Sequence, residues 1–302
     1  MKVVVAGANG LIGSHLVRAL RKRGDTVVAL VRDARGSDPA EVRSWDGKSQ
    51  GRWAGAVDGA DAVVCLAGAP VAKRWTSGHK AAIRASRVEA VRALVEAMRA
   101  ASRRPRAFVS GSAVGYYGFR GDALLDESAA AGDDFLAGVC VAWEGEARGA
   151  EALGVRTVLL RSGVILARDG GALGRMLLPF RAFVGGPVGD GRQWLSWIHI
   201  DDEIGLILHA IDREVRGPMN ATAPEPATMR DFAKALGKAL GRPSWLPVPG
   251  FALRLGLGEM SSMLTESQRA VPKAALESGY TFRFPTLASA LADLFGGARA
   301  SA

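Results

Sequence analysis

The chain of 302 residues lacks a long hydrophobic run and contains little cysteine. No stretch reaches the roughly 18 apolar residues that a membrane-spanning helix needs, so we expect no membrane span. A strand pattern begins directly after Met1, which predicts that no signal peptide precedes the fold. The two cysteines, Cys65 and Cys140, lie in apolar segments without a CxxC spacing. Buried free thiols are typical of a reducing compartment, and we therefore expect a cytoplasmic protein.

Histidine is also scarce, and positive charge is not concentrated anywhere. The four histidines are not spaced with acidic residues as metal ligands are, so no metal site is expected. The net charge is +9, but the 39 Lys and Arg residues form no basic run interleaved with aromatic side chains. We expect no nucleic-acid partner. The positive net charge either suits an anionic small-molecule ligand or reflects a bias of composition. We expect the protein to be a monomer or a homodimer.

Buried apolar strands alternate with helices through the first half of the chain. The predicted strands are 2–6, 26–31, 62–66, 106–110 and 155–160, and the predicted helices are 11–23, 77–101 and 135–153. This alternation predicts a parallel sheet covered by helices on both faces. The expected fold is therefore α/β, a doubly wound sheet of the Rossmann type.

The pattern changes after Leu166. Gly and Pro are dense between residues 170 and 191, where the strand–helix alternation stops before it resumes at 197. Two units are therefore predicted, a Rossmann core and a smaller C-terminal substrate subdomain. The core comprises residues 1–166 and is completed by about 197–222, and the subdomain comprises 167–196 and 223–302. The cleft between the two units is the expected ligand site.

A glycine-rich turn connects the first predicted strand to the first helix. Gly7 permits a tight turn, Gly10 lets the backbone approach a pyrophosphate, and Gly13 lets the helix pack on the sheet. Free N–H groups at the start of the helix then hold the phosphates. The residues predicted to contact a dinucleotide here are Gly7, Asn9, Gly10, Leu11 and Ile12. The alternative is an ordinary turn between strand and helix.

The end of the second predicted strand indicates which dinucleotide is bound. NAD-specific proteins of this fold usually carry an acidic residue there, which binds the ribose 2′-hydroxyl. Here the strand ends at Val31 and is followed by Arg32, whose guanidinium can bind a 2′-phosphate through two hydrogen bonds. Asp33 is expected to point away. These residues favour NADP(H) over NAD(H), unless Arg32 is only a solvated charge.

The spacing of the three glycines resembles that of the extended short-chain dehydrogenases/reductases. Further motifs resemble one atypical branch, the NAD(P)-dependent sugar-nucleotide epimerases with a small C-terminal domain. The motifs are residues 65–68, 74–76, 86–87, 110–118, 170–173, 176–180, 185–187 and 197–202. The segment from 246–249 to 284–286 resembles the C-terminal domain of that branch.

The resemblance implies a set of site residues. Those assigned to the cofactor are Leu66, Ala67, Gly68, Arg87 and Ser110. Arg87 lies on the predicted helix 77–101, from which it would point back to the cofactor. Alternatively, it is solvated or paired with a neighbouring acid. Ser112 lies at the end of the predicted strand 106–110, which corresponds to the fifth strand of the superfamily, where the superfamily keeps a serine that hydrogen-bonds the reacting oxygen of the substrate. Ser112 is therefore the first catalytic candidate.

The acid–base pair that the resemblance implies is missing. In the superfamily, a Tyr on the next helix exchanges a proton with the substrate, and a Lys four residues later keeps the phenolate charged. Leu136 and Cys140 occupy these two positions, and no lysine lies between Lys80 and Lys234.

Several side chains are candidate substitutes. Tyr116, with Tyr117 beside it, follows Ser112 and is the second catalytic candidate. Cys140 is better explained as a buried thiol, and His199 as a packed, hydrogen-bonded residue. The loop 185–197 either wraps an anionic ligand or fills the core with its tryptophans. The polar residues of interest in or near that loop are Arg161, Arg175, Arg192 and Gln193.

Two functions of different classes follow from these features. The first is an NADP(H)-binding epimerase or oxidoreductase that acts by hydride transfer on a small polar substrate, with nucleotide sugars among the candidates. The second is a non-catalytic NADP(H)-binding regulator or sensor, in which the loss of the Tyr and Lys is the functional change.

Overall fold

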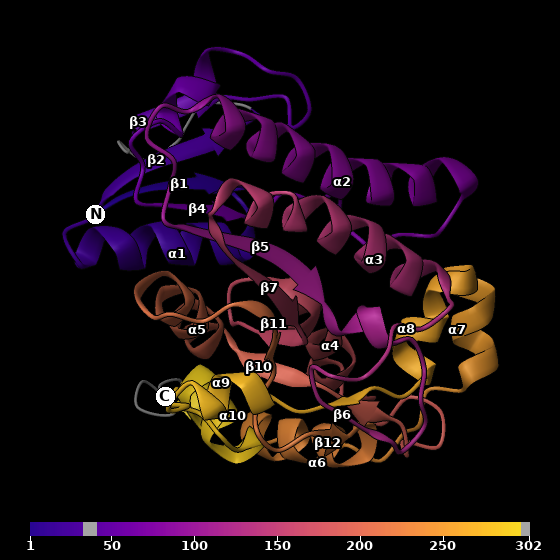
Figure 1. The fold of residues 1–302 in the computed structure, drawn as a ribbon. Coiled ribbons are helices and arrows are strands. Elements are labelled where there is room, and N and C mark those ends of the chain that lie inside the picture. The colour runs from indigo at the N-terminus through magenta and orange to yellow at the C-terminus, as the bar shows by residue number, and fades with distance from the viewer. Residues whose placement is uncertain (33–40, 297–302) are drawn as a thin grey trace.

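A seven-stranded parallel sheet runs through the middle of the molecule (Figure 1). The structure is a computed structural model that describes residues 1–32 and 41–296, so Asp33 lies outside the described residues. The strand order is β11-β7-β5-β4-β1-β2-β3, and every neighbouring pair is parallel. The predicted doubly wound parallel sheet is confirmed. Across the described residues, no helix has the length and apolar character of a membrane span.

The strands and helices have the following bounds. The sheet strands are β1 (Lys2–Ala6), β2 (Thr26–Val31), β3 (Glu41–Ser44), β4 (Ala62–Cys65), β5 (Ala107–Ala113), β7 (Arg156–Ser162) and β11 (Gly217–Ala221). The short strands are β6 (Leu124–Leu125), β8 (Val164–Leu166), β9 (Trp194–Leu195), β10 (Trp197–His199), β12 (Ala227–Thr228) and β13 (Arg269–Ala270). The helices are α1 (Leu11–Lys22), α2 (Ser77–Ala100), α3 (Phe135–Arg148), α4 (Gly171–Arg181), α5 (Ile200–Asp212), α6 (Met229–Leu240), α7 (Gly250–Leu257), α8 (Ser262–Thr265), α9 (Lys273–Glu277) and α10 (Leu287–Gly296). Short 3-10 helices lie at Arg52–Ala56, Val114–Tyr117, Glu151–Leu153 and Gly258–Ser261.

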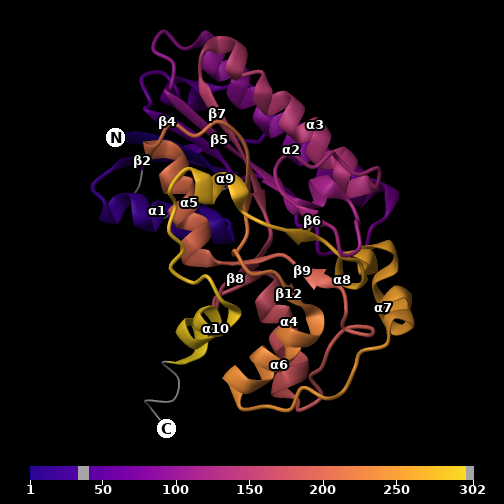
Figure 2. The ribbon, with the colours of Figure 1, turned by 60° about the horizontal axis from the view of Figure 1, so that its bottom comes forward.

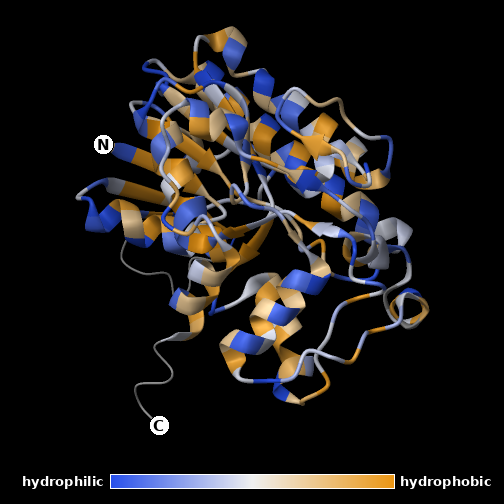
Figure 3. Ribbon diagram, turned by 90° about the horizontal axis from the view of Figure 1, so that it is seen from below, coloured by the Kyte–Doolittle hydropathy of each residue, from blue (hydrophilic) through white to orange (hydrophobic). Residues whose placement is uncertain are grey.

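Helices cover both faces of the sheet because both faces are apolar. Helices α2 and α3 lie on one face, and α1 and α5 lie on the other (Figure 1). Side chains alternate along each strand. On β1, Val3 and Val5 join the core beneath α1 and α5, while Val4 and Ala6 join the core beneath α2 and α3. Figure 3 shows the resulting hydrophobic strands, with hydrophilic residues on the outer parts of the helices.

A third core holds the C-terminal region together. Helices α4, α6 and α10 lie beyond the sheet (Figure 2), around the fully buried Trp197. The strand arrows of the sheet point toward the side where α4, α7 and α8 lie (Figure 1). We propose that the chain divides as the composition predicts, with β11 completing the core. The carboxyl ends of the strands therefore face the C-terminal region.

Strand β3 and helix α4 are among the elements that were absent from the sequence prediction. Strand β3 reads Glu-Val-Arg-Ser and lies at the edge of the sheet, so it has one apolar residue and no alternating pattern. Helix α4 begins at Gly171 and contains Pro179, and this composition favours a loop. The sequence pattern predicted that the strand–helix alternation stops between residues 170 and 191, and it did not predict a helix at 171–181. Burial of Leu173, Leu177 and Phe180 in the third core stabilises this helix.

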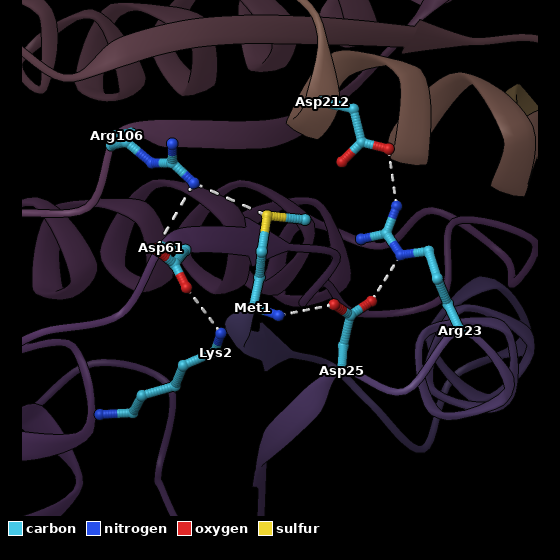
Figure 4. A network of polar contacts seen from close by, with 7 residues as sticks. All are labelled: Met1, Lys2, Arg23, Asp25, Asp61, Arg106 and Asp212. Carbon is cyan, nitrogen blue, oxygen red and sulfur yellow. Dashed lines mark hydrogen bonds and ion pairs between the residues drawn. The ribbon is translucent and has the colours of Figure 1, made fainter.

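A polar network fixes the amino ends of the strands (Figure 4). Asp25 accepts hydrogen bonds from the amino group of Met1 at 2.9 Å and from Nε of Arg23 at 2.6 Å. Arg23 also donates to Asp212 at the end of α5, at 2.7 Å. Asp61 accepts the backbone N–H of Lys2 at 2.8 Å. This network lies at the edge of the sheet opposite the glycine turn, so it supports the fold without entering the candidate site.

Candidate functional site

The glycine turn has no room for side chains. Gly7 adopts a φ of +81°, and a Cβ placed on it would lie 2.8 Å from the backbone N of Ala67. A Cβ on Gly13 would lie 2.2 Å from the carbonyl oxygen of Gly7. Gly10 caps α1 without a side-chain hydrogen bond, and the first turn of α1 contains no acidic residue. The exposed N–H groups and the positive end of the helix therefore fit the pyrophosphate of a dinucleotide.

The other residues predicted to contact the dinucleotide surround this turn. Asn9 is exposed, Leu11 and Ile12 are half-buried, and Arg32 is exposed directly after β2. Leu66, Ala67 and Gly68 follow β4, the strand next to β1. The structure thus brings the predicted phosphate, ribose and 2′-phosphate contacts to neighbouring positions at one edge of the sheet.

Two polar contacts hold α4 against this edge. His15 of α1 lies 2.9 Å from Oδ2 of Asp169, in the loop before α4. A Cβ placed on Gly171 would lie 2.9 Å from the side chain of Leu11. Arg175 of α4 donates to the carbonyl of Ala72 at 2.6 Å, so this predicted positive charge fastens α4 to the loop after β4.

A cavity of about 310 Å³ lies at the carboxyl ends of β5 and β7. It begins at Ile12 and Leu66, beside the glycine turn, and much of its wall is apolar. The polar residues that line it include Arg87, Ser112, Ser162, Ser196, Glu266 and Gln268. A mostly apolar cavity with a few converging polar groups is the usual form of a small-molecule site.

Ser112 lines this cavity and belongs to a buried polar chain. Its Oγ donates to Oε1 of Glu144 on α3 at 2.7 Å. Arg161 binds the same carboxylate through Nε at 2.8 Å and Nη2 at 2.9 Å. Burial alone would lower the pKa of Arg161, but the hydrogen bonds to Glu144 raise it above the ordinary value. Ser112 therefore has a fixed orientation, with its proton directed to a carboxylate.

The tyrosines do not reach the cavity as the sequence prediction supposed. The ring of Tyr116 lies against the guanidinium of Arg161, with its centroid 3.4 Å from Cζ. The hydroxyl of Tyr117 donates to Asn220 at 2.7 Å and accepts from Arg161 at 3.0 Å. Neither tyrosine is among the described residues that line the cavity. The packing of both rings on Arg161 makes them part of the buried chain around Glu144.

The wall where the acid–base pair is missing is apolar. Leu136, Val139 and Cys140 of α3 line the cavity at these positions. Burial raises the pKa of the Cys140 thiol to about 12, and it does the same for Cys65. Both thiols are buried and free, as predicted, and at neutral pH they stay protonated and unreactive.

Arg87 lines the cavity and also supports the loop after β4. Its Nη1 donates to the carbonyls of Ala69, at 3.1 Å, and Ile83, at 3.0 Å. Burial lowers the pKa of its guanidinium. A Cβ on Gly68 would lie 3.0 Å from Cζ of Arg87, so the arginine lies directly against the segment predicted to contact the ribose. Arg87 can therefore act on a cofactor through this loop as well as directly.

The remaining predicted residues have structural partners. Ser110 is fully buried and donates to the carbonyl of Gly111 at 3.2 Å. His199 is buried against Phe284 and caps α5, and its burial lowers its pKa. In loop 185–197, Gln193 donates to two backbone carbonyls and Arg192 is exposed. Of that loop, Trp194, Leu195 and Ser196 line the cavity.

Glu144, Ser162 and Glu203 are among the polar residues at the site that were not predicted from the sequence. Glu144 lies one turn after Cys140, so the spacing Leu136, Cys140, Glu144 placed it on the same face of α3. Ser162 ends β7 and lines the cavity, and it donates to Glu203 at 2.6 Å. Glu203 is fully buried in α5, and burial raises its pKa to about 7. The sequence signal that could have identified Glu203 is a carboxyl group within the apolar face of α5.

Glu203 gives the stability of the fold a dependence on pH. Its pKa rises from 4.5 for an exposed glutamate to about 7 in the folded chain. Between these values the folded state keeps a proton that the unfolded state has lost, so the free energy of unfolding falls as the pH rises. We expect a loss of about 3 kcal/mol that is complete above pH 7 or so.

Urea unfolding of the wild type and of Glu203→Gln across this pH range measures the effect. The difference in unfolding free energy between the two proteins should change by about 3 kcal/mol in favour of the variant as the pH rises. The exposed Glu225→Gln serves as the matched control and should follow the wild type. Parallel curves for the wild type and Glu203→Gln would show that Glu203 is ionised in the folded state.

The glycine turn, the uncapped start of α1 and the cavity at the carboxyl ends of the strands define a class of protein. They are the features of a dinucleotide-binding α/β protein with a second ligand site beside the dinucleotide.

Comparisons with protein families refine this class. The model described as "NAD dependent epimerase/dehydratase family" matches residues 3–222, and "Domain of unknown function (DUF1731)" matches residues 248–294. The chain belongs to the NAD-dependent epimerase/dehydratase family, and the resemblance stated from the motifs is confirmed.

Relatives match over nearly the whole chain. It is 40% identical over 298 residues to "Epimerase family protein SDR39U1 homolog, chloroplastic" of Arabidopsis thaliana, covering 96% of this chain and 86% of the relative. It is 38% identical over 297 residues to "Epimerase family protein YfhF" of Bacillus subtilis, covering 97% and 98%. The crystal structure of the human epimerase family protein SDR39U1 with NADPH superposes with a TM-score of 0.89 at 36% identity, covering 98% and 99%. Because one relative is named as chloroplastic, the cytoplasmic location stays a prediction.

Proposed function

We propose that the protein binds NADP(H) and that hydride transfer takes place with a small molecule held in the cavity. The observation that carries this proposal is one cavity that begins at Ile12 and Leu66 and also exposes Ser112 to its interior. The same edge of the sheet therefore offers a dinucleotide turn and a polar group for a second molecule. The NADPH in the crystal structure of the human relative supports the choice of cofactor.

The residues of the chain divide the work of binding. The glycine turn and α1 hold the pyrophosphate, and Arg32 binds the 2′-phosphate. When bound, the cofactor supplies or accepts the hydride. Ser112 already donates its proton to Glu144, so it accepts a hydrogen bond from a hydroxyl or N–H of the substrate. Leu136, Val139 and Cys140 exclude water from the reacting group.

The family resemblance favours a small polar substrate, with nucleotide sugars among the candidates. Epimerisation would require oxidation to a ketone, rotation and renewed reduction without loss of the cofactor. Of the described residues that line the cavity, Arg87 carries a positive charge, and its Nη1 is bound to Ala69 and Ile83. We therefore propose that only the reacting group of the substrate enters the cavity and that an anionic part, where present, stays outside.

The non-catalytic regulator remains the second candidate. The apolar Leu136 and Cys140 at the acid–base positions favour it, because a sensor of NADP(H) needs no proton donor. Such a protein would bind the cofactor as tightly as an enzyme does but would not oxidise it.

Cofactor binding and turnover test the proposal together. By fluorescence titration, we expect the wild type to bind NADPH about tenfold or more tightly than NADH, and Arg32→Asp to lose this preference. Arg84→Asp, an exposed change of the same charge on α2, is the matched control and should keep it. Equal affinities of the wild type for NADPH and NADH would remove Arg32 from the site. Oxidation of NADPH by members of a panel of carbonyl compounds, with a loss in Ser112→Ala, supports the enzyme, whereas tight binding without oxidation supports the regulator.

A further inference from the structure

A second pair of serine and carboxyl reaches the same cavity. Ser162 lines it, and its Oγ lies 2.6 Å from Oε1 of Glu203. In the sheet, Ser112 is paired with Arg161 and Ala113 with Ser162. The two serines therefore stand on neighbouring strands but are directed to opposite faces, Ser112 toward α3 and Ser162 toward α5. The cavity is therefore lined by one serine that is bonded to the α3 side of the sheet and one that is bonded to the α5 side.

The two carboxyl groups have opposite environments. Glu144 accepts two hydrogen bonds from the positively charged guanidinium of Arg161. Glu203 is fully buried with Ser162 as its hydrogen-bonding partner, and its Oε2 has no hydrogen bond to the described residues. Burial raises the pKa of Glu203 to about 7, so it keeps its proton in weakly acidic solution. Two carboxyls with such different environments are the usual arrangement of an acid and a base.

The protonation of Glu203 decides what Ser162 offers to the cavity. Ser162 donates to Oε1 of Glu203 when that oxygen carries no proton. A neutral Glu203 with its proton on Oε1 donates to Oγ of Ser162 instead, which leaves the hydroxyl proton of Ser162 free for a ligand. An ionised Glu203 accepts a hydrogen bond from the hydroxyl of Ser162, so this proton is not available to a ligand. Ser112, which faces the carboxylate of Glu144, offers only lone pairs. Of the two serines, Ser112 is thus a fixed acceptor and Ser162 is a donor that can be switched.

Several charged and titratable groups on α5 and on the elements packed against it are held by partners of their own. On α5, Asp202 accepts from Tyr280 and from the backbone of Arg283 and Phe284. On α1, His15 is bound to Asp169. Further groups on the packed elements are Arg161 of β7, bound to Glu144 on the other face of the sheet, and His199 at the start of α5, bound to the backbone of Asp201. Ser162 is therefore the hydrogen-bonding partner of Glu203 among the described residues, and burial, Asp202 and the charge of Glu203 together raise the pKa of Tyr280.

We propose that Ser162 and Glu203 form the proton-donating pair of the reaction and replace the missing Tyr and Lys. This inference rests on the proposed function. In the reducing direction, the carbonyl carbon of the substrate receives the hydride of NADPH, and the carbonyl oxygen takes the hydroxyl proton of Ser162. Ser162 takes the proton of Glu203. Because Glu203 is fully buried, its carboxylate regains a proton from water in the cavity through Ser162 before the next turnover. Ser162 is the catalytic residue, and Glu203 acts through it as a positioning residue.

Binding of the two cofactor forms tests the location of Glu203 without any substrate. NADP⁺ carries a positive charge on its nicotinamide and NADPH does not, so a nearby Glu203 ionises more readily beside NADP⁺. We expect the ratio of Kd for NADP⁺ to Kd for NADPH to fall about fivefold between about pH 5.5 and about pH 8.5. The 2′-phosphate titrates in both forms and cancels in the ratio. Calorimetry of the wild type near pH 6.5 or so, in two buffers of different ionisation enthalpy, should show more proton release with NADP⁺ than with NADPH.

Two variants separate the roles of the pair. Glu203→Gln should make the ratio independent of pH, and Ser162→Ala should keep its pH dependence because the carboxyl remains. With a carbonyl compound that the wild type reduces, Ser162→Ala should lower kcat about 100-fold, and Glu203→Gln should remove the fall of kcat above pH 7 or so.

The outcomes distinguish the inference from the proposed function. A flat ratio in the wild type, an unchanged ratio profile in Glu203→Gln, or full turnover in Ser162→Ala overturns the inference alone. Absence of binding of both nucleotides, or binding without reduction of any carbonyl compound, overturns the proposed function and the inference with it.

Discussion

Glu144→Ala is expected to destabilise the fold by about 3–5 kcal/mol, because it leaves Arg161 buried without its counter-charge. The side chains of Arg161 and Glu144 are 2% and 3% exposed, so water does not solvate either group. The substitution removes both hydrogen bonds to the guanidinium and the acceptor of Ser112. The guanidinium would keep its contacts with Tyr116, Tyr117 and the backbone carbonyl of Glu127, none of which supplies a negative charge. Chemical denaturation monitored by circular dichroism measures the loss.

The same helix supplies the matched control for this prediction. Glu146, two residues later on α3, pairs with Arg92, but that pair is exposed to solvent. Glu146→Ala should therefore cost no more than about 1 kcal/mol. Equal losses for Glu144→Ala and Glu146→Ala would mean that the buried pair adds nothing beyond an ordinary surface pair. The double variant Glu144→Leu with Arg161→Met should recover much of the loss, since it removes both charges.

Gly13→Ala is expected to weaken NADPH binding about 100-fold or more. The added Cβ would lie 2.2 Å from the carbonyl oxygen of Gly7, a contact with backbone that no change of rotamer can relieve. Helix α1 must therefore move away from the turn, and the N–H groups at its start lose their alignment with the pyrophosphate. Isothermal titration with NADPH measures the effect.

A second glycine-to-alanine change controls for the loss of helical glycine. Gly138 lies inside α3 with nothing within 4 Å of an added Cβ. Gly138→Ala should keep the NADPH affinity and stabilise the fold by about 0.5–1 kcal/mol. An NADPH affinity of Gly13→Ala close to that of the wild type would show that the turn does not position a dinucleotide.

The sequence predicted the central fold because its core signals are local. The runs 2–6 and 26–31 are apolar throughout and became β1 and β2 with the same bounds. The tight turn could also be predicted from its glycines, because no other residue fits where Gly7 meets the backbone of Ala67. Strand β3 and helix α4 could not be predicted, because the edge of a sheet and a third core stabilise them through partners distant in the sequence.

The candidate site was predicted only in part, for a similar reason. Ser112 could be identified from its place at the end of β5, and the missing Tyr and Lys from Leu136 and Cys140. The partner of Ser112 is Glu144 of α3, 32 residues later in the chain, and the partner of Ser162 is Glu203 of α5, 41 residues later. No local pattern indicates that Glu144 is bound to Arg161 while Glu203 is not. The ionisation of each carboxyl is a property of the tertiary structure.

The pairing of β5 with β7 has a consequence for how this site changes in evolution. The register that sets Ser112 beside Arg161 and Ala113 beside Ser162 is fixed by the core of the sheet. Other residues around the cavity, such as Phe119, Met263 and Gln268, belong to connecting segments or a short helix. Mutations in these segments can alter which molecules enter while the two serines keep their partners. Specificity can therefore diverge among relatives at little cost to folding, whereas a change of chemistry requires substitutions in the buried sheet itself.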